Sequence, residues 1–404
     1  MSDIENTGPL KGWKIIDLSR VLGGPYCTQL LGDLGADVIK IEPPQGDETR
    51  EWGPPFDGRG EAAYFMGVNR NKKSVALDIR TDEGKAILLR LLEGADALVE
   101  NFKTGSLEKW GLGYDDVLSK KFPRLIHCRV TGFGADGPLG GYPGYDAVLQ
   151  AMCGWFTVNG PPEGSGVRIG IPLVDIGTGL FAANAILAAG LEREKSGKGQ
   201  SVEASLFDTG IAFQHPHAPN WFLSGKPPVR VGNAHTNIAP YDAFPSGTVD
   251  IYLSVGNNGQ FRKLCEALGA PEVASDPRFL NNAERVQNKP ALRETLVKLL
   301  ADKDGEALCL ELLKYGVPAG PILDMKGILT HPHAKHRKMV VEKDGYKGVG
   351  IPIKFSRTPG TVRKRPPTFG ENDRDVLKDA GFSEDEIARF IEAGVVLEQR
   401  RKAQ

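Results

Sequence analysis

One acidic side chain is distinguished by its surroundings. Asp175 stands at the start of a long apolar stretch within residues 166–200, GVRIGIPLVDIGTGLFAANAILAAGLEREKSGKGQ, and charge returns only at Glu192. From Leu180 to Leu191 apolar side chains occupy every face of a helical projection, which predicts a helix buried on all sides and too short to span a bilayer. Position alone leaves two interpretations open for Asp175, a plain helix N-cap or a functional carboxylate.

Other reactive residue types give weaker patterns. Cys27 falls in the first turn of an expected helix without a histidine base nearby, so a buried structural cysteine is the better interpretation. His331, His333 and His336 lie in HPHAKH, where Pro332 breaks helical spacing and no acid or cysteine follows, which favours a solvated turn over a metal site. The five cysteines are scattered and contain no CxxC pair, so we expect reduced thiols and no metal.

The composition is that of a globular protein acting on a small molecule. The chain has 404 residues, 40% of them apolar, which is enough for two or three domains. Lys and Arg total 50 against 51 for Asp and Glu, so no overall field attracts nucleic acid or an anionic membrane. The opening MSDIENTGPLKGW lacks the apolar core of a signal peptide, and we expect a cytoplasmic location.

Strand and helix patterns alternate through the first half of the chain. The expected strands are Lys14–Leu18, Asp37–Glu42, Asp96–Glu100, Arg124–Val130 and Gln200–Ser205, and the expected helices are Tyr26–Leu34, Asp82–Leu92, Tyr114–Lys120 and Leu206–Phe213. This alternation predicts an α/β fold with a parallel sheet covered on both faces. The dinucleotide fingerprint G-x-G-x-x-G is absent at residues 23–26.

Ligands of such sheets bind beyond the carboxyl ends of the strands. The loops expected there are residues 19–25, 42–47, 101–103 and 131–134, and they are rich in Gly, Asn, Lys and Thr. Each loop alone could be a plain connection. Together they define one edge that could hold a phosphate or a pantetheine-like chain.

The chain divides into three expected parts. Residues 1–215 form a large domain, residues 225–325 a small domain after a proline-rich linker at 216–228 with an exposed Trp221, and residues 330–404 return to the large domain. The small domain is expected to contain strands Tyr241–Phe244 and Ile251–Ser254 and helices Phe261–Leu268, Pro290–Ala301 and Gly305–Tyr315. Short strands within 338–355 and two helices within 373–396 are expected in the last part. The loop at 255–260 could present backbone amides to an anion or be an ordinary turn.

Several motifs together resemble one enzyme family. They are SRVLGGPYCTQLLGDLGADVIKIEPPQGDETR, YFMGVNRNKKSVALDI, VENFKTGSLEKWGLGYDDV, TGFGADGP, GYDAV, VDIGTGL, SGKGQSVEASLFD, VGNNGQF and FGENDRDVLKDAGFSEDEIARFIEAGVV. Over nearly the whole chain they resemble the family III CoA-transferases, a group that includes formyl-CoA transferase, carnitine CoA-transferase and the alpha-methylacyl-CoA racemases. The resemblance is greatest to succinyl-CoA:dicarboxylate CoA-transferases.

The resemblance implies a Rossmann-like large domain, a smaller α+β domain and an interlinked ring-shaped homodimer, with an acyl-CoA as co-substrate. It implies Asp175 as the catalytic aspartate, with Gly256 and Gly259 in a loop that closes over the reaction. Implied CoA contacts are Arg20, Val21, Leu22, Gly23, Lys73, Ser74, Val75, Ala76, Asn101, Phe102, Lys103, Lys109, Thr131, Gly132 and Phe133. Tyr145, Arg168 and His235 are candidate contacts to the acid substrate. Leu22 and Pro43 replace a glutamine and an arginine of the formyl-CoA transferase pattern.

The implied activity is transfer of CoA from an acyl-CoA, with succinyl-CoA as the expected donor, to a carboxylic acid that we expect to be dicarboxylic. The route would pass through an aspartyl mixed anhydride and an aspartyl-CoA thioester. A racemase remains an alternative, although Tyr145 stands where racemases carry histidine and a phenol is a poor base at neutral pH. One subunit of a heteromeric CoA-transferase would have the same sequence features.

Overall fold

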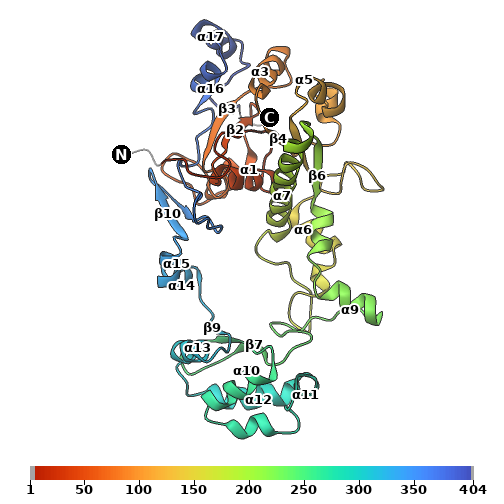
Figure 1. The fold of residues 1–404 in the computed structure, drawn as a ribbon, viewed down its shortest axis with the longest axis vertical. Coiled ribbons are helices and arrows are strands. Elements are labelled where there is room, and N and C mark those ends of the chain that lie inside the picture. Colours follow the sequence, from red (N-terminus) through yellow and green to blue (C-terminus); the bar gives the residue numbers. More distant parts are fainter. Residues whose placement is uncertain (1–4, 402–404) are drawn as a thin grey trace. The chain divides into compact units, whose positions relative to one another are not determined.

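The computed structural model describes residues 5–401, and contacts divide the chain into two units (Figure 1). The first unit comprises the chain up to Cys153, Ile169–His215 and the chain from Pro332 onwards. The second comprises Gly154–Arg168 and Pro216–His331. Relative to the ranges expected from the sequence, the second unit also takes Gly154–Arg168.

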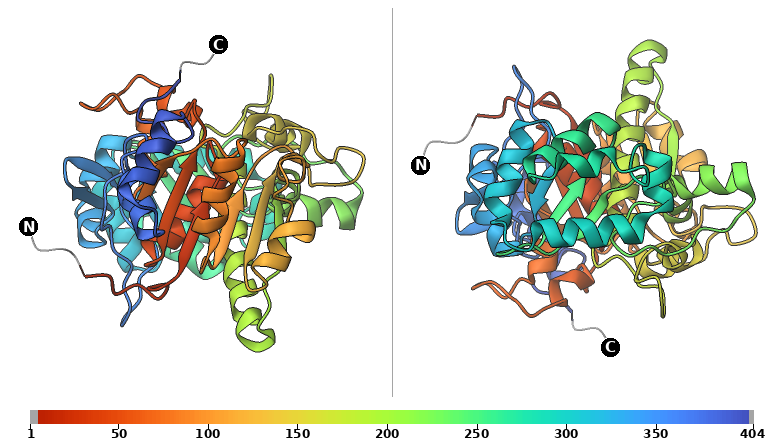
Figure 2. Two further views of the ribbon diagram at one scale, coloured as in Figure 1. Left: turned by 90° about the horizontal axis from the view of Figure 1, so that it is seen from above. Right: turned by 90° about the horizontal axis from the view of Figure 1, so that it is seen from below.

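A six-stranded parallel sheet forms the centre of the first unit (Figure 2, left). Its strands are β1 Lys14–Asp17, β2 Asp37–Glu42, β3 Lys72–Ala76, β4 Ala97–Glu100, β5 Ile126–Thr131 and β6 Ser201–Ser205. The spatial order is β3-β2-β1-β4-β5-β6, with every neighbouring pair parallel. The order reverses between β1 and β4, and a crevice opens at such a switch point beyond the carboxyl ends of the strands.

Helices connect these strands. In the first unit they are α1 Gly23–Asp33, α2 Ala63–Met66, α3 Asp82–Leu92, α4 Ser106–Lys109, α5 Ser119–Lys121, α6 Asp146–Met152, α7 Leu173–Ser196, α8 Leu206–Ala212, α15 Pro332–His336, α16 Asp373–Asp379 and α17 Glu384–Glu392. The expected helix at 114–120 is a π-helical turn, Tyr114–Leu118, followed by α5. The HPHAKH segment forms the short helix α15 instead of a turn, because Pro332 occupies the first helical position, where a missing N–H costs nothing.

The two faces of the sheet differ in chemistry. On one face Ile16, Ile39 and Leu98 pack in an apolar cluster with Ile87 and Leu88 of α3. On the other face, toward α1, strand residues of the opposite parity are charged and fully buried: Asp17, Lys40, Glu42 and Lys72. Asp17 and Lys40 are paired in register across β1 and β2. A buried ionic layer therefore lies directly beneath the loops that follow β1 and β2.

Helix α7 corrects the expectation of burial on all sides. The side chains of Leu180, Phe181 and Leu191 are 43%, 42% and 71% exposed, while Ala182 and Ile186 are buried. By length and composition the 24-residue helix is long and apolar enough to cross a membrane, with half of its most apolar window buried inside the fold. Its contacts with α1, β5, β6 and α8 are those of a core helix. Gly197, with φ of 76°, ends it where the sequence indicated.

The second unit is built on a three-stranded antiparallel sheet in the order β7-β8-β9. Its elements are α9 His217–Ser224, β7 Tyr241–Phe244, β8 Ile251–Ser254, α10 Asn258–Ala267, α11 Asn282–Gln287, α12 Lys289–Leu300, α13 Gly305–Lys314, β9 Ala319–Pro321 and α14 Met325–Thr330. Phe261, Leu296 and Leu312 belong to its own buried apolar cluster. The segment expected to be a linker, 216–228, contains α9, in which Trp221 is exposed.

The final part of the chain adds to the first unit. A hairpin of β10 Val340–Lys343 and β11 Tyr346–Val349 precedes α16 and α17. Asp373 of α16 accepts a hydrogen bond from the Ala76 amide at 2.8 Å, and Val396 bridges to Leu77. These contacts attach the C-terminal part of the chain to the edge strand β3 and the residue that follows it.

Candidate active site

A cleft of about 340 Å³ lies at the switch point of the sheet, where the loops after β1, β4, β5 and β6 meet. Asp175 lies in its lining. The other lining residues are Arg20, Val21, Leu22, Gly23, Glu48, Asn101, Phe102, Lys103, Thr104, Val130, Thr131, Gly132, Gly134, Gly141, Tyr142, Pro143, Gly144, Tyr145 and Leu206. The edge expected from strand–loop alternation is therefore a real concave site, and it contains the acid singled out from the sequence.

Asp175 is the third residue of α7, so it lies in the first turn and is not the cap. Pro172 occupies the N-cap position and its side chain makes no capping bond. Within residues 5–401, no hydrogen bond or ion pair reaches the Asp175 carboxyl group, whereas Glu48 in the same cleft is paired with Arg20 at 3.0 Å. Asp175 thus offers an unengaged carboxyl group to a ligand.

Asp146, which sequence reasoning passed over as part of GYDAV, caps α7 from outside. Its Oδ2 accepts the N–H groups of Val174 at 2.8 Å and Asp175 at 3.3 Å, and its Oδ1 accepts Gln150 Nε2 at 2.6 Å. Gly132 and Gly144 make the close approach that carries Asp146 there, since a Cβ on Gly132 would lie 2.5 Å from the Gly144 nitrogen. Only the tertiary fold reveals this cap.

The electrostatics of Asp175 disfavour its ionised form, although the residue lies in the first turn of a helix. Burial, followed by the charge of Asp146, raises the pKa of Asp175 to about 7. Two of the first-turn amides that would have stabilised its charge are instead bound to Asp146. The Asp175 carboxyl group therefore changes protonation state near neutral pH.

A second pocket of about 290 Å³ adjoins the first at the ends of β2 and β3. It shares Arg20, Phe102 and Lys103 with the cleft, and these residues form a common wall. Its other lining residues are Leu18, Ile41, Pro43, Gln45, Leu77, Asp78, Ile79, Arg80, Ser106 and Trp110. Phe102 and Trp110 meet edge to face, with ring centroids 5.1 Å apart. Cations and aromatic rings together suit a flat heterocycle bearing phosphates.

The structure brings most of the expected CoA contacts together, but not all. Ser74, Val75 and Ala76 are fully buried, so they cannot contact a ligand, and the residues that line the second pocket instead are Asp78, Ile79 and the exposed Arg80, which follow them. Lys73 points to Asp37 at 3.1 Å, and exposed Lys109 lines neither pocket. Phe133 packs against Phe207 outside the cleft lining.

Four of the expected site residues belong to the second unit, and their place relative to Asp175 stays a prediction: Arg168, His235, Gly256 and Gly259. The loop around Gly256 is tied down, because Gln260 Oε1 accepts the Gly256 amide at 2.8 Å. Gly259 lies inside the first turn of α10, which Asn257 caps. Burial, followed by the charge of Lys289, lowers the pKa of His235, so His235 is neutral at pH 7 and a weaker candidate for binding a carboxylate.

Metal coordination finds no support among the described side chains. Over residues 5–401, no three His, Cys, Asp or Glu side chains come together in a group that could hold an ion. The five cysteines are free and buried, and burial raises the pKa of the Cys27 thiol well above its ordinary value. Asp175 remains the candidate nucleophile in the cleft.

Comparison with known proteins finds sequence relatives that are CoA-transferases and a solved structure of similar fold. A succinate–glutarate CoA-transferase of Agrobacterium fabrum is 40% identical over 93% of this chain and 97% of its own length. The succinyl-CoA:glutarate CoA-transferase of Homo sapiens is 38% identical over 98% of this chain and 91% of its own length. A crystal structure of a CAIB/BAIF family protein from Brucella suis matches with a TM-score of 0.84 at 42% identity, covering 93% of this chain and all (100%) of that one.

The family model for CoA-transferase family III matches residues 10–373, which include the whole second unit, most of the first unit and every lining residue of the cleft. The matched region also includes Asp175 and the Asp146 cap. The chain belongs to CoA-transferase family III, and it is a CoA-transferase.

Proposed function

We propose that this CoA-transferase moves CoA from succinyl-CoA to a dicarboxylic acid, with Asp175 as the nucleophile. The observation that carries the proposal is the unengaged carboxyl group of Asp175 in the switch-point cleft. Full-length similarity to transferases named for succinyl-CoA and glutarate supports the donor and the acceptor class.

The reaction follows from carboxylate chemistry. A carboxylate oxygen of Asp175 attacks the thioester carbon, the C–S bond breaks, and CoA leaves as a thiolate from a mixed anhydride. The thiolate then attacks the Asp175 carbonyl carbon, releasing the donor acid and leaving an aspartyl-CoA thioester. The acceptor carboxylate repeats these two steps in reverse order and leaves with CoA.

The two pockets suggest how acyl-CoA lies. The nucleotide end would occupy the second pocket, with its phosphates near Arg80 and Lys103, and the pantetheine arm would cross the shared wall toward Asp175. Pro43 lines this pocket where the formyl-CoA transferase pattern has arginine, so Arg80 could supply the missing charge. Leu22 lines the cleft and cannot donate the hydrogen bond that a glutamine would.

For the far carboxylate of the acid substrate, Arg20 is the best placed cation. It lines the cleft, and one nitrogen of its guanidinium, Nη1, forms an ion pair with Glu48 at 3.0 Å. Both side chains are about one-third exposed, 32% and 35%, so a substrate carboxylate could compete for the pair.

We also propose a cytoplasmic homodimer with interlinked chains. The exposed apolar side chains of Leu180, Phe181 and Leu191 on α7 supply an apolar surface that a second copy could cover. Sedimentation of the intact chain tests this; a monomer at micromolar concentration would contradict it.

The substrate assignment has a direct test. The protein is incubated with succinyl-CoA and a panel of straight, branched and aryl-substituted dicarboxylic acids of about four to six carbons, and new acyl-CoA is detected by mass spectrometry. We expect transfer to dicarboxylates and little to the matching monocarboxylates, because only the former engage Arg20. Proton exchange at the alpha carbon without transfer would favour the racemase alternative.

The pH dependence of transfer is a second expected result. Because only the carboxylate attacks and its pKa is about 7, kcat/KM should rise with pH through about 7 and level off above it. Replacing Asp146 with Asn removes the neighbouring charge and should move this rise toward lower pH, while burial, the larger cause, keeps the pKa of Asp175 above its ordinary value. Rate profiles for both proteins check this, and an unmoved profile in the Asp146→Asn variant would contradict the assigned cause.

A further inference from the structure

The turn between β1 and α1 contains a strained residue at the edge of the cleft. Val21 has a φ of 70°, in the left-handed region that β-branched residues rarely adopt. Such a conformation costs about 1–3 kcal/mol and persists only where surrounding contacts hold it. Val21 lines the cleft together with Asp175, so the strain lies at the site of the reaction.

The side chains of Asn101 and Asp47 form hydrogen bonds with the two ends of the peptide group between Arg20 and Val21. Asn101 Nδ2 donates to the Arg20 carbonyl at 2.7 Å, and Asn101 Oδ1 accepts the Arg20 amide at 2.9 Å. Asp47 Oδ1 accepts the Val21 amide at 3.3 Å. Rotation of this peptide group out of its present orientation would break bonds to both residues.

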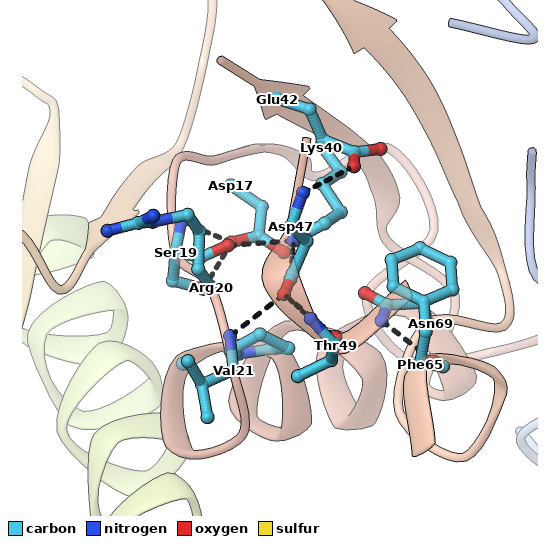
Figure 3. Close-up of polar contacts among 12 residues, drawn as sticks. Asp17, Ser19, Arg20, Val21, Lys40, Glu42, Asp47, Thr49, Phe65 and Asn69 are labelled. Atoms are coloured by element: carbon cyan, nitrogen blue, oxygen red, sulfur yellow. Dashed lines mark hydrogen bonds and ion pairs between the residues drawn. The ribbon is translucent and has the colours of Figure 1, made fainter. Parts of the chain in front are cut away.

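Asp47 is itself held by contacts within the buried ionic layer, as Figure 3 shows. Asp47 is fully buried, pairs with Lys40 at 3.0 Å and accepts the Thr49 hydroxyl at 2.7 Å. Lys40 also donates to the Ser19 carbonyl at 2.7 Å. Side chains from β2, the loop after it and the loop after β4 thus converge on three consecutive residues of the turn.

The turn lies in direct backbone contact with the helix that contains Asp175. A Cβ on Gly23 would lie 3.4 Å from the Asp175 carbonyl oxygen, and one on Gly179 would lie 2.6 Å from the Gly23 carbonyl oxygen. Helices α1 and α7 therefore touch backbone to backbone, with the turn on one side and the nucleophile on the other. A shift of the turn would change the space in which a thioester meets the carboxylate.

We propose that Asn101 and Asp47 are positioning residues that hold Val21 in its left-handed conformation and so keep the edge of the cleft in place for attack by Asp175. The amide of Asn101 is engaged by the backbone of Arg20, and its role is to fix the turn and not to bind CoA directly. This inference rests on the proposed function of Asp175, and it concerns the residues that align the reaction.

The test combines two substitutions. Asn101→Ala should lower kcat for CoA transfer about 10- to 100-fold and change KM for acyl-CoA less than about threefold, because a displaced edge misaligns the attack more than it weakens binding. Adding Val21→Gly should restore most of the lost kcat, since glycine adopts positive φ without being held. Lys103→Ala, in the same loop, is the control: it should raise KM, and Val21→Gly should not correct it.

Thermal unfolding of the native protein, both single variants and the double variant gives a readout that needs no substrate. We expect the double variant to be at least as stable as Asn101→Ala. If the stability losses of the two single variants simply added up in the double variant, the inference would be overturned. A raised KM with unchanged kcat and no rescue would also overturn it, because that is the result for direct CoA binding. Should Asn101→Ala not fold, Asn101→Asp keeps the acceptor and loses only the donor, and its kcat should fall less.

If no acid accepts CoA from the native protein, the proposed function fails. The unfolding cycle would still decide whether Asn101 holds Val21, so the two failures are distinguishable.

Discussion

Replacing Asp175 with asparagine is expected to abolish CoA transfer and, at the same time, to stabilise the protein above neutral pH. Loss of the nucleophile should lower kcat by about 10⁴-fold or more, since an amide cannot form the anhydride. The gain in stability has a separate cause. Burial and the charge of Asp146 raise the pKa of Asp175 from 3.8 to about 7, so the folded protein holds this group's charge at a cost.

The sign of this effect sets the pH at which it is visible. A raised folded-state pKa favours folding while the group is protonated, below about pH 4, and that contribution is lost as pH rises through about 7. The asparagine side chain of the variant carries no charge at any pH, so folding does not bury a charge there. The Tm of the Asp175→Asn variant should therefore match the native value near pH 4 and exceed it at pH 8. Water in the open cleft screens the charge, so we expect on the order of 2 kcal/mol.

Calorimetry at both pH values, alongside transfer assays, checks both halves of this prediction. Asp82→Asn is the matched control, because Asp82 is also an acid in the first turn of a helix but lies outside both pockets. It should leave transfer unchanged and lose a favourable helix-terminus contact. Equal Tm values for native and Asp175→Asn proteins at pH 8 would refute the raised pKa.

The sheet and the cleft could be predicted from the sequence because the patterns that indicate them lie within short segments of the chain. Strand β2 and helix α3 begin and end at the predicted residues, since Asp37–Glu42 and Asp82–Leu92 are bounded by turn and capping residues. The carboxyl ends of parallel strands must lie at one edge, so the loops after β1 and β4 were expected to be neighbours. Asp175 was singled out by its place at the start of an apolar run, but the run alone left a helix cap and a functional carboxylate both open, and only the family resemblance favoured the carboxylate.

The buried ionic layer and the Asp146 cap were not predictable in the same way. Lys40 in DVIKIE alternates with apolar residues, as an exposed strand position would, yet it is fully buried because Asp17 is opposite in register and Asp47 follows in the next loop. Asp146 reaches α7 only because the backbones at Gly132 and Gly144 touch. Each depends on contacts between residues distant in sequence, for which spacing carries no signal.

The exposed side of α7 has a similar origin. An apolar helix can be buried by its own chain or covered by another, and the sequence pattern is the same in both cases. Leu191 is exposed in the single chain, although the apolar composition of the helix predicted that it would be buried. Hydrophobicity therefore predicted burial for a side chain that the single chain leaves exposed.

The largest expected loss of stability comes from Arg50, at the edge of the ionic layer. Its guanidinium is fully buried and forms two bonds with Glu42, Nε to Oε2 at 2.8 Å and Nη2 to Oε1 at 2.6 Å. Its Nη1 also forms an ion pair with Glu61 Oε2 at 2.7 Å, and the guanidinium stacks 3.7 Å from the centre of the Phe65 ring. Removing one partner of a buried pair leaves the other charge uncompensated, so Arg50→Met should cost about 3–5 kcal/mol.

This loss should depend on pH in a defined direction. Burial alone would raise the pKa of Glu42, but the attraction of Arg50 holds it at about 2. Without Arg50 the Glu42 carboxyl group should protonate far more easily, and a protonated acid needs no counter-charge. The variant should therefore lose more stability at pH 8 than at pH 5, as measured by denaturant unfolding together with hydrogen exchange in β2.

Arg80 provides the comparison that isolates burial. It forms the same two-bond pair with Asp78, Nε to Oδ1 at 2.8 Å and Nη2 to Oδ2 at 2.7 Å, but its side chain is 56% exposed. The Asp78 side chain is only 10% exposed, but it keeps the hydrogen bond from the residue 80 backbone amide at 3.1 Å after the guanidinium is gone, so Arg80→Met should cost less than Arg50→Met and show less pH dependence. If the two variants lost equal stability, the ionic layer would contribute no more than an ordinary surface pair. A large difference would show that the layer beneath the turn is a structural requirement, because its charges have no solvent to return to.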